Sequence, residues 1–446
     1  MHAFDLTRRD FMKLAAVPLL PIQSPPVDPW QETSAILARI KDPVFPDRDF
    51  DVSRYKSIND AITACSEAGG GRVIVPAGIR TIDPIRLRSR VNLHLSAGAI
   101  LKFTTDPQRY LPAVFTRWEG TELMNYSPFI YAFDQTDIAI TGSGTLDGQA
   151  STMQWWDWTR QAAPARRRLM DFGANGTPVG ERVFGEGSFL RPNFIQPYRC
   201  RNVLIEGISI VNSPMWEIHP VLCTNVIVRR VSINSHGPNN DGCNPESCRD
   251  VLIEGCSFDT GDDCIALKSG RNNDGRRLGV PVENVIIRDC TMKDGHGGVT
   301  IGSEISGGAR NIFAERCRMD SPQLDRALRI KTNSVRGGVI ERVFVRDVSV
   351  GEVREAIVAV DFNYEEGDAG PFTPIVRDIE VRNVNSSKSN YALLLRGYAR
   401  TPVTNLRVRD CRFDNVARAD VLENVKDIAL TNVAVNGRVL TQTITR

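Results

Sequence analysis

Hydrophobic and polar positions alternate with a period of two in a series of short segments along most of the chain. Each copy starts with a polar residue, continues with alternating Val or Ile positions for eight or nine residues, and ends in a turn rich in Gly, Asp and Asn. This alternation, with β-branched residues dominant, is typical of strands rather than helices. The copies start at Asn202, Asn225, Asp250, Asn284, Asn311, Arg342, Asp378, Asn405 and Asp427.

The copies follow one another at intervals of 22 to 36 residues, and no helix-length amphipathic segment separates them. The absence of such segments disfavours sheets built from strand-helix-strand units. An interval of this length fits one coil of a solenoid in which each strand pairs with the next at about 4.8 Å. The pattern therefore predicts an all-β fold, a right-handed parallel β-helix.

Four cysteines recur at one position of the repeat, six residues after the start of their copies. Other copies carry Ile208, Val231 and Val348 at that position, which indicates an apolar interior row with Cys as a small hydrophobe. Cys243 and Cys248 form either a local disulfide or two buried thiols, and this choice stays open. The four recurring cysteines are Cys256, Cys290, Cys317 and Cys411.

The N-terminal part contains earlier copies, at 90–95 and 136–141, and two features outside the repeat. Residues 57–67 show helical spacing, with Ser57 as N-cap and Gly69 to Gly71 as the stop, so we expect a short helix that caps the open end of the solenoid. An insertion at about 147–200 holds three Trp and the run Arg166-Arg167-Arg168. It is predicted to be a surface loop beside a ligand groove.

Composition excludes several classes of protein. The 446 residues are 41% hydrophobic and 24% charged, with no apolar run of 18 residues, so a disordered or membrane-spanning protein is not expected. Lys and Arg number 55 against 53 Asp and Glu, a net charge of +2. This balance argues against a nucleic-acid partner. We expect a monomer that recognises charge only locally.

Four polar clusters interrupt successive copies and carry the candidate chemistry. Asp262 and His296 both lie twelve residues after the start of their copies, so they should be neighbours on adjacent coils. Asp241 precedes Asp262 by 21 residues, close to one coil. One patch is therefore predicted to contain Asn239-Asn240-Asp241, Gly261-Asp262-Asp263, Gly295-His296-Gly297 and Arg329-Ile330-Lys331.

Neighbouring carboxylates repel, so one keeps its proton while the other stays ionised, as glycoside hydrolysis requires. The pair Arg329 and Lys331 suits an anionic sugar, and the glycines would let backbone and substrate approach closely. Asp262 and Asp263 could instead cap a turn through their side chains.

Three further residues are candidates by position. Trp216 lies one coil before Asp241 and either stacks on a sugar or packs in the core. Arg271 begins a polar loop, residues 271–277, at the rim of the groove. His236, just before Gly237, belongs either to a turn or to the site.

Together these motifs resemble the glycoside hydrolases of family 28, the polygalacturonases and their relatives. The family's Asn-Thr-Asp, Gly-Asp-Asp, Gly-His-Gly and Arg-Ile-Lys occur here in order, with Asn240 in place of Thr, and the likeness runs over about residues 45–435. The resemblance implies a pectin-degrading glycosidase that inverts the anomeric centre and uses no metal or other cofactor.

By the same resemblance, Asp262 is the general acid, Asp241 and Asp263 hold the attacking water, and His296 supports the acid. Arg329 and Lys331 would bind a substrate carboxylate. Apart from the resemblance, Asn239, Trp216 and Arg271 are expected as further substrate contacts. The insertion and the loop at 271–277 could close one end of the groove, so we expect attack from chain ends. Two alternatives stay open, a calcium-dependent pectate lyase and a non-catalytic carbohydrate-binding β-helix.

The first residues carry a separate signal. Thr7-Arg8-Arg9-Asp10-Phe11-Met12-Lys13, followed by a short apolar stretch, resembles a twin-arginine export signal. We therefore expect residues 1–28 to be a signal or tail, residues 29–446 to form a single β-helix catalytic domain, and the protein to be periplasmic or secreted.

Overall fold

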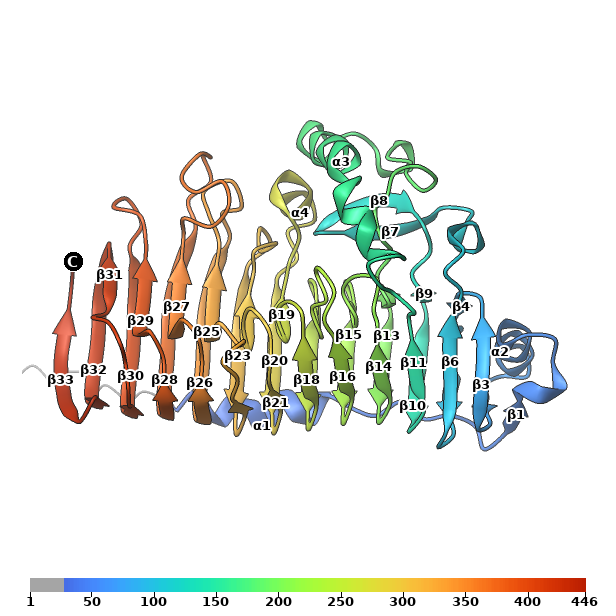
Figure 1. Ribbon diagram of the computed structural model, residues 1–446, viewed down its shortest axis with the longest axis horizontal. Coiled ribbons are helices and arrows are strands. Elements are labelled where there is room, and N and C mark those ends of the chain that lie inside the picture. Colours follow the sequence, from blue (N-terminus) through green and yellow to red (C-terminus); the bar gives the residue numbers. More distant parts are fainter. Residues whose placement is uncertain (1–27) are drawn as a thin grey trace, which may run out of the picture.

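The computed structural model describes residues 28–446, in which a single coil of parallel strands runs along the molecule (Figure 1). Each strand of a coil pairs in parallel with its counterpart in the next coil, as β13 does with β15 and β15 with β17. The predicted fold, an all-β right-handed parallel β-helix, is confirmed. The twin-arginine segment lies outside the described residues.

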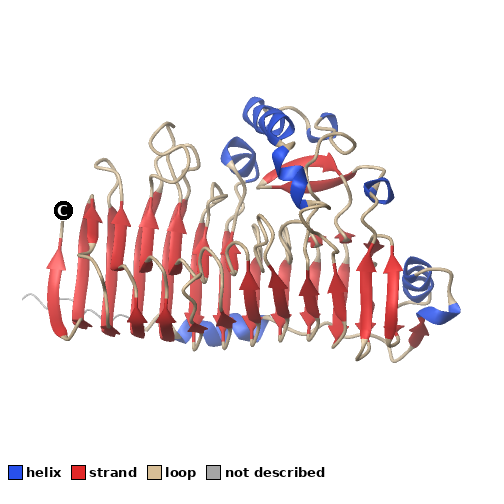
Figure 2. Ribbon diagram, in the orientation of Figure 1, coloured by secondary structure: helices blue, strands red, loops and turns tan. Residues whose placement is uncertain are grey.

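Two sheets form most of the coil, and helices lie outside it (Figure 2). The first sheet contains β1 (Asp49–Asp51), β2 (Gly71–Val75), β3 (Gly78–Ile82), β5 (Val91–Leu95), β6 (Ala99–Phe103), β10 (Thr136–Gly142), β11 (Thr145–Asp147), β13 (Arg201–Glu206), β14 (Ser209–Val211), β15 (Thr224–Arg229), β16 (Ser232–Ser235), β17 (Arg249–Glu254), β18 (Ser257–Thr260), β20 (Val282–Arg288), β21 (Thr291–Met292), β23 (Ala309–Glu315), β24 (Arg318–Met319), β26 (Val339–Glu352), β28 (Ile375–Lys388), β30 (Val403–Phe413), β32 (Val425–Val435) and β33 (Arg438–Ile444).

The second sheet contains β19 (Ile265–Leu267), β22 (Val299–Ile301), β25 (Arg326–Lys331), β27 (Ala356–Asp361), β29 (Tyr391–Arg396) and β31 (Val421–Glu423). A small third sheet contains β4 (Ile85–Arg86), β9 (Ile130–Phe133) and β12 (Ile195–Tyr198), and a hairpin contains β7 (Val114–Trp118) and β8 (Thr121–Asn125). The helices are α1 (Gln31–Arg39), α2 (Ile58–Glu67), α3 (Ala163–Asn175) and α4 (Asn272–Leu278), with short 3₁₀ turns at Val52–Arg54, Pro107–Tyr110, Trp156–Arg160 and Val179–Glu181.

The nine residues predicted to begin the copies of the repeat share one backbone conformation. All have a φ between 53° and 58°, in the left-handed region that Asn and Asp tolerate better than most residues. Their side chains form a ladder, in which Asn225 Nδ2 donates to Asn202 Oδ1 at 2.8 Å and Asn311 Nδ2 to Asn284 Oδ1 at 2.9 Å. The copies therefore stack in the register that the repeat predicts.

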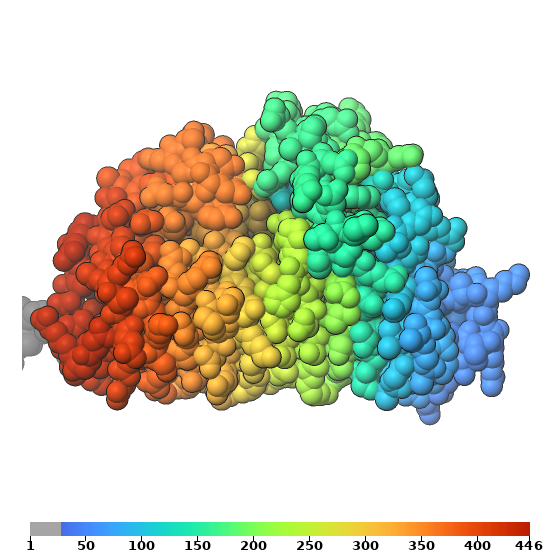
Figure 3. All heavy atoms as spheres, in the orientation of Figure 1, coloured from blue at the N-terminus to red at the C-terminus, as the bar shows by residue number. Residues whose placement is uncertain are grey.

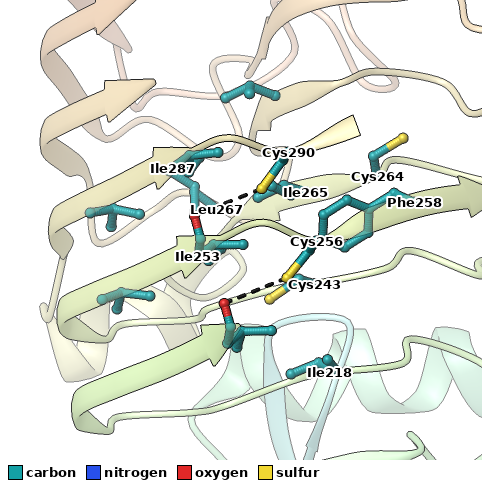
Figure 4. Close-up of a cluster of buried hydrophobic side chains, with 14 of the residues drawn as sticks. Ile218, Cys243, Ile253, Cys256, Phe258, Cys264, Ile265, Leu267, Ile287 and Cys290 are labelled. Atoms are coloured by element: carbon teal, nitrogen blue, oxygen red, sulfur yellow. Dashed lines mark hydrogen bonds between the residues drawn. The ribbon is translucent and has the colours of Figure 1, made fainter. Parts of the chain in front are cut away.

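The interior of the coil is apolar, and its cysteines behave as hydrophobic residues. Figure 4 shows Cys256 and Cys290 beside Ile253 and Ile287 inside the coil, where Cys290 Sγ donates to the carbonyl of Ile253. All ten cysteines are buried and free, including Cys243. Of the two alternatives for Cys243 and Cys248, the structure has buried thiols.

Both ends of the coil are covered. At the N-terminal end, α2 is the predicted capping helix, and Ser57 Oγ accepts a hydrogen bond from the Asp60 N–H. After it the chain turns at Gly70, with φ of 108°, where a Cβ would lie 2.5 Å from the Arg90 carbonyl oxygen. At the other end, β33 folds back antiparallel on β32.

The helix α1, which the sequence pattern did not predict, lies along the outer face of the first sheet (Figure 1). It covers an apolar row made by outward-facing strand residues such as Leu204, Ile227 and Leu252, packed against Trp30 and Ile36. Only part of one face of this short helix is apolar, so the hydrophobic periodicity of its sequence is too weak to predict a helix. Within residues 28–446, no helix is long and apolar enough to cross a membrane.

The insertion forms a folded wall and not the predicted surface loop. Its helix α3 packs against β8 and α4, and Trp155 is buried beside Tyr110 and Phe129. The predicted loop at 271–277 is mostly the helix α4. The helices α3 and α4 and the hairpin stand on one side of the coil (Figure 1), where the buried Arg182 of the insertion pairs with Asp274 of α4.

Candidate active site

The four predicted clusters come together on neighbouring coils. Asp241 follows β16, Asp262 and Asp263 lie between β18 and β19, His296 lies between β21 and β22, and Arg329 and Lys331 lie on β25. Backbone hydrogen bonds join these turns, since the His296 N–H donates to the Asp262 carbonyl at 3.1 Å. Oxygens of Asp241, Asp262 and Asp263 lie within 4.8 Å of one another.

Asp262 and His296 form an accessible pair. Nδ1 of His296 lies 2.9 Å from Oδ1 of Asp262, and the side chains are 49% and 17% exposed, respectively. The hydrogen bond to Asp262 raises the pKa of His296, and burial only partly opposes it. A charged imidazole can thus face the carboxyl group that is expected to donate a proton.

Asp263 is fully buried and surrounded by donors. Its Oδ1 accepts from Thr300 Oγ1 at 2.9 Å and Arg329 Nη1 at 3.1 Å, and its Oδ2 accepts from Lys331 Nζ at 2.7 Å. Burial alone would raise the pKa of Asp263, but the two cations outweigh burial and hold it below its ordinary range. Asp263 is therefore a permanent negative charge at the base of the site.

Asp241 has the opposite environment. Burial, followed by the charge of Asp262, raises the pKa of Asp241 to about 8, although Lys268 Nζ lies 3.6 Å from its Oδ2. Asn244 Nδ2 donates to the same oxygen at 3.0 Å. Asp241 therefore keeps its proton at neutral pH, in contrast to the ionised Asp263.

The glycines of the site serve the contact between coils. A Cβ on Gly295 would lie 2.5 Å from the Asp262 carbonyl oxygen, and one on Gly297 would lie 3.0 Å from Oδ1 of Asp263. The expected close approach of the backbone at these glycines is thus observed, whereas the approach of a substrate stays a prediction.

A pocket opens above the carboxylates, between the insertion and the loop that joins β27 to β28. In Figure 3 the insertion, in green, and the orange region that contains this loop rise on either side of a notch. The lining residues are Glu119, Arg166, Trp216, Asn239, Asp241, Asp262, Lys268, Ser303, Glu304, Lys331, Tyr364 and Glu365.

The structure changes the interpretation of three predicted substrate contacts. Arg271 is buried and its guanidinium lies 3.2 Å from Glu119, 3.5 Å from Glu304 and 3.1 Å from Glu365. It is not among the pocket residues, so it holds the wall together. Arg329 is also outside the lining, and both Arg329 and Lys331 are paired with Asp263, where the sequence had predicted a substrate carboxylate.

Trp216 and Asn239 line the pocket but have protein partners. Trp216 is buried, packs edge-on against His219, and has Lys268 Nζ 4.3 Å from its ring centroid. Core packing is therefore its main role, and its ring is not an open platform. Asn239 Oδ1 accepts from Arg191 Nη2 at 2.7 Å.

His236, which the sequence left open, is partly exposed and pairs with Asp259 at 3.0 Å. Together with Asp294 it forms one of two acidic groups in the described residues whose ligand atoms lie close enough to meet a metal ion. The other is the carboxylate group of the site. There Lys268, Arg329 and Lys331 already supply the positive charge that a metal would bring.

Several pocket residues escaped the sequence analysis. Lys268 had a usable signal, because it is a lone cation ending the apolar run Ile265-Ala266-Leu267. Glu119, Tyr364 and Glu365 had none, since they come from segments outside the repeat. In the sequence, Arg166 is marked only as part of an arginine run.

Comparisons with known proteins agree with this site and fold. The family model described as Glycosyl hydrolases family 28 matches residues 186–435. The crystal structure of a hyperthermoactive exopolygalacturonase from Thermotoga maritima is 41% identical, with a TM-score of 0.91 over 93% of this chain and 98% of that one.

Two more distant proteins are also similar. A probable polygalacturonase from Vitis vinifera is 28% identical, over 82% of this chain and 72% of its own length. The structure of a polygalacturonase from Erwinia carotovora is 22% identical, with a TM-score of 0.67 over 87% of this chain and 98% of that one, and it shares the fold.

Proposed function

The chain belongs to family 28 of the glycosyl hydrolases, and we propose that this hydrolase releases units from the ends of galacturonate-containing pectic chains. The observation that carries the proposal is the convergence of three carboxylates, the His296 imidazole and the cations Lys268, Arg329 and Lys331 at the base of a walled pocket. A glycosidase needs one carboxyl group that donates a proton and another that activates water.

Asp262 is the proposed general acid. It is the most exposed of the three carboxyl groups, and it lies next to His296, which can stabilise the carboxylate that remains after proton donation. In the proposed reactive state, the proton that Asp241 holds at neutral pH has passed to Asp262, and Asp241 carries the charge. Asp241 then accepts a proton from the attacking water, while the fixed charge of Asp263 helps to orient that water.

Inversion of the anomeric centre is the proposed stereochemical outcome, by likeness to the family. The carboxylate oxygens lie within 4.8 Å of one another, whereas carboxyl groups of inverting glycosidases are commonly about 6.5–9.5 Å apart. The water must therefore lie beside the pair and not between its members. Proton NMR of the first product formed decides the question, because a β-anomer from an α-linked chain indicates inversion.

Action at chain ends is supported by the wall of the pocket, which the insertion, the hairpin and the loop between β27 and β28 form together. Arg166 of the insertion, Glu119 of the hairpin and Glu365 of the loop between β27 and β28 line the same pocket, with Arg166 Nη2 at 2.9 Å from Glu119 and 3.9 Å from Glu365. These contacts join segments from distant parts of the chain across one end of the groove. The similar Thermotoga maritima protein is an exopolygalacturonase.

The experiment is a time course on polygalacturonate with the products separated by length. We expect monomer, or one short oligomer, to be the only early product, without absorbance from unsaturated sugars and without loss of rate in a chelator. Fragments of random length would contradict action at chain ends. Unsaturated products with a calcium requirement would contradict hydrolysis and favour a lyase.

A further inference from the structure

Three cations line the pocket, and they differ in how exposed they are and in how closely a carboxylate of the protein already pairs with them. Lys268 and Lys331 are buried, and their ammonium groups lie 2.9 Å from Glu304 and 2.7 Å from Asp263, respectively. The side chain of Arg166 is 43% exposed. Among the described residues lining the pocket, Arg166 is therefore the cation most open to an incoming anion.

The guanidinium of Arg166 is held in place along one edge. Its Nε donates to Oε2 of Glu119 at 2.9 Å, and its Nη2 lies 2.9 Å from the same oxygen. Glu119 is in turn fixed by the buried Arg271, at 3.2 Å. Within residues 28–446, Nη1 of Arg166 makes no hydrogen bond, so this edge of the guanidinium remains available in a set orientation.

We propose that Arg166 binds the carboxylate of the terminal galacturonate unit, and thereby determines the preference of this pocket for an acidic chain end. The inference deepens the proposed function and rests on it. A planar guanidinium with free N–H groups is well suited to a carboxylate. The Arg329 and Lys331 pair predicted for this role is already paired with Asp263.

The other charges of the wall explain why only one sugar carboxylate fits here. Glu119, Glu304 and Glu365 line the same pocket as Arg166. A second galacturonate beyond the terminal unit would bring its carboxylate towards these acidic side chains, which repel it. Arg166 therefore accepts one carboxylate, and the surrounding glutamates disfavour continuation of the chain.

The test compares binding of galacturonate with binding of its methyl ester, a neutral ligand of nearly the same shape. The variant is Arg166→Gln, with Arg166→Lys as the conservative form. Arg167→Gln is the matched control, because Arg167 neighbours Arg166 on α3 but is exposed and does not line the pocket. Titrations are followed by NMR or calorimetry, and thermal unfolding shows that each variant is folded.

We expect Arg166→Gln to weaken galacturonate binding about 10- to 100-fold, the range for losing hydrogen bonds to a charged group, and to leave the methyl ester unaffected. Arg166→Lys should fall in between, and Arg167→Gln should match the unmodified protein. Equal losses for both ligands, no loss, or no preference for galacturonate in the unmodified protein would each overturn the inference.

Hydrolysis of polygalacturonate by the unmodified protein is measured separately. If no hydrolysis occurs but the Arg166 effect on binding persists, the proposed function fails and the carboxylate site stands. If hydrolysis proceeds from chain ends and the Arg166 variants bind normally, the proposed function stands and the assignment of Arg166 fails.

Discussion

Asp262 and His296 are 34 positions apart in the sequence, yet Oδ1 of Asp262 and Nδ1 of His296 are separated by only 2.9 Å. The distance follows from the repeat, because the coils that start at Asp250 and Asn284 stack in register and place both residues at the same point of adjacent turns. The repeat length of the solenoid thus places the proposed acid, Asp262, next to its partner, His296.

Replacing His296 by Gln should lower kcat about 10- to 100-fold and change KM little, because the hydrogen bond supports charge that develops on Asp262 only during proton donation. Steady-state kinetics on a galacturonate oligomer measures this. His236→Gln is the matched control, since His236 is also partly exposed and paired with an aspartate. Equal effects of the two variants would argue against a role of His296 at the acid.

The pH profile should fall on the alkaline side. The pKa of Asp241 is raised to about 8, so above that pH Asp241 loses the proton that the proposed mechanism passes to Asp262. We expect kcat/KM to decline above about pH 8, approaching tenfold per pH unit. The measurement uses a short galacturonate oligomer at constant ionic strength, and an activity that stays constant to pH 10 would contradict a role for the Asp241 proton.

The proton on Asp241 should also affect the free energy of unfolding, which can be measured without any substrate. Between the pKa of an unfolded Asp, about 3.9, and about 8, the folded protein keeps a proton on Asp241 that the unfolded chain has lost. This group alone therefore lowers the free energy of unfolding by about 1.4 kcal/mol per pH unit as the pH rises. Asp241→Asn should be stabilised relative to the unmodified protein, increasingly so from pH 4 to pH 8, in denaturant unfolding; a difference independent of pH would refute this.

Much of the fold could be predicted because one physical rule repeats. Each coil is defined by a polar first residue with a positive φ and by the alternating apolar residues that follow it. Residues such as Val226 and Val251 pair between neighbouring strands as the repeat requires. The proximity of Asp262 and His296 then follows from counting along the chain.

The residues that meet in the wall of the pocket could not be predicted in this way. Glu119, Arg166 and Glu365 come from segments without a period, and their meeting depends on how the insertion packs. Nor does the sequence tell which anion a cation will bind. Arg329 and Lys331 could bind a sugar carboxylate or a protein one, and in the structure both are paired with the buried Asp263.

Asp263 should be essential for stability as well as for activity. Asp263→Asn removes the buried charge that balances Arg329 and Lys331, and breaking a buried ion pair costs about 3–5 kcal/mol. The control is Asp259→Asn, because Asp259 is partly exposed beside His236 and should cost at most about 1 kcal/mol. Urea unfolding compares the two, and similar costs would contradict the assignment of Asp263 as a buried counter-charge.

The most direct measurement of the central claim is turnover of a galacturonate oligomer by Asp262→Asn, with binding of the same oligomer followed in parallel. We predict that kcat falls about 10²- to 10⁴-fold, the usual contribution of a general acid, while binding and folding are retained. Turnover close to that of the unmodified protein would contradict the account, because the proton for the departing sugar would then come from another group.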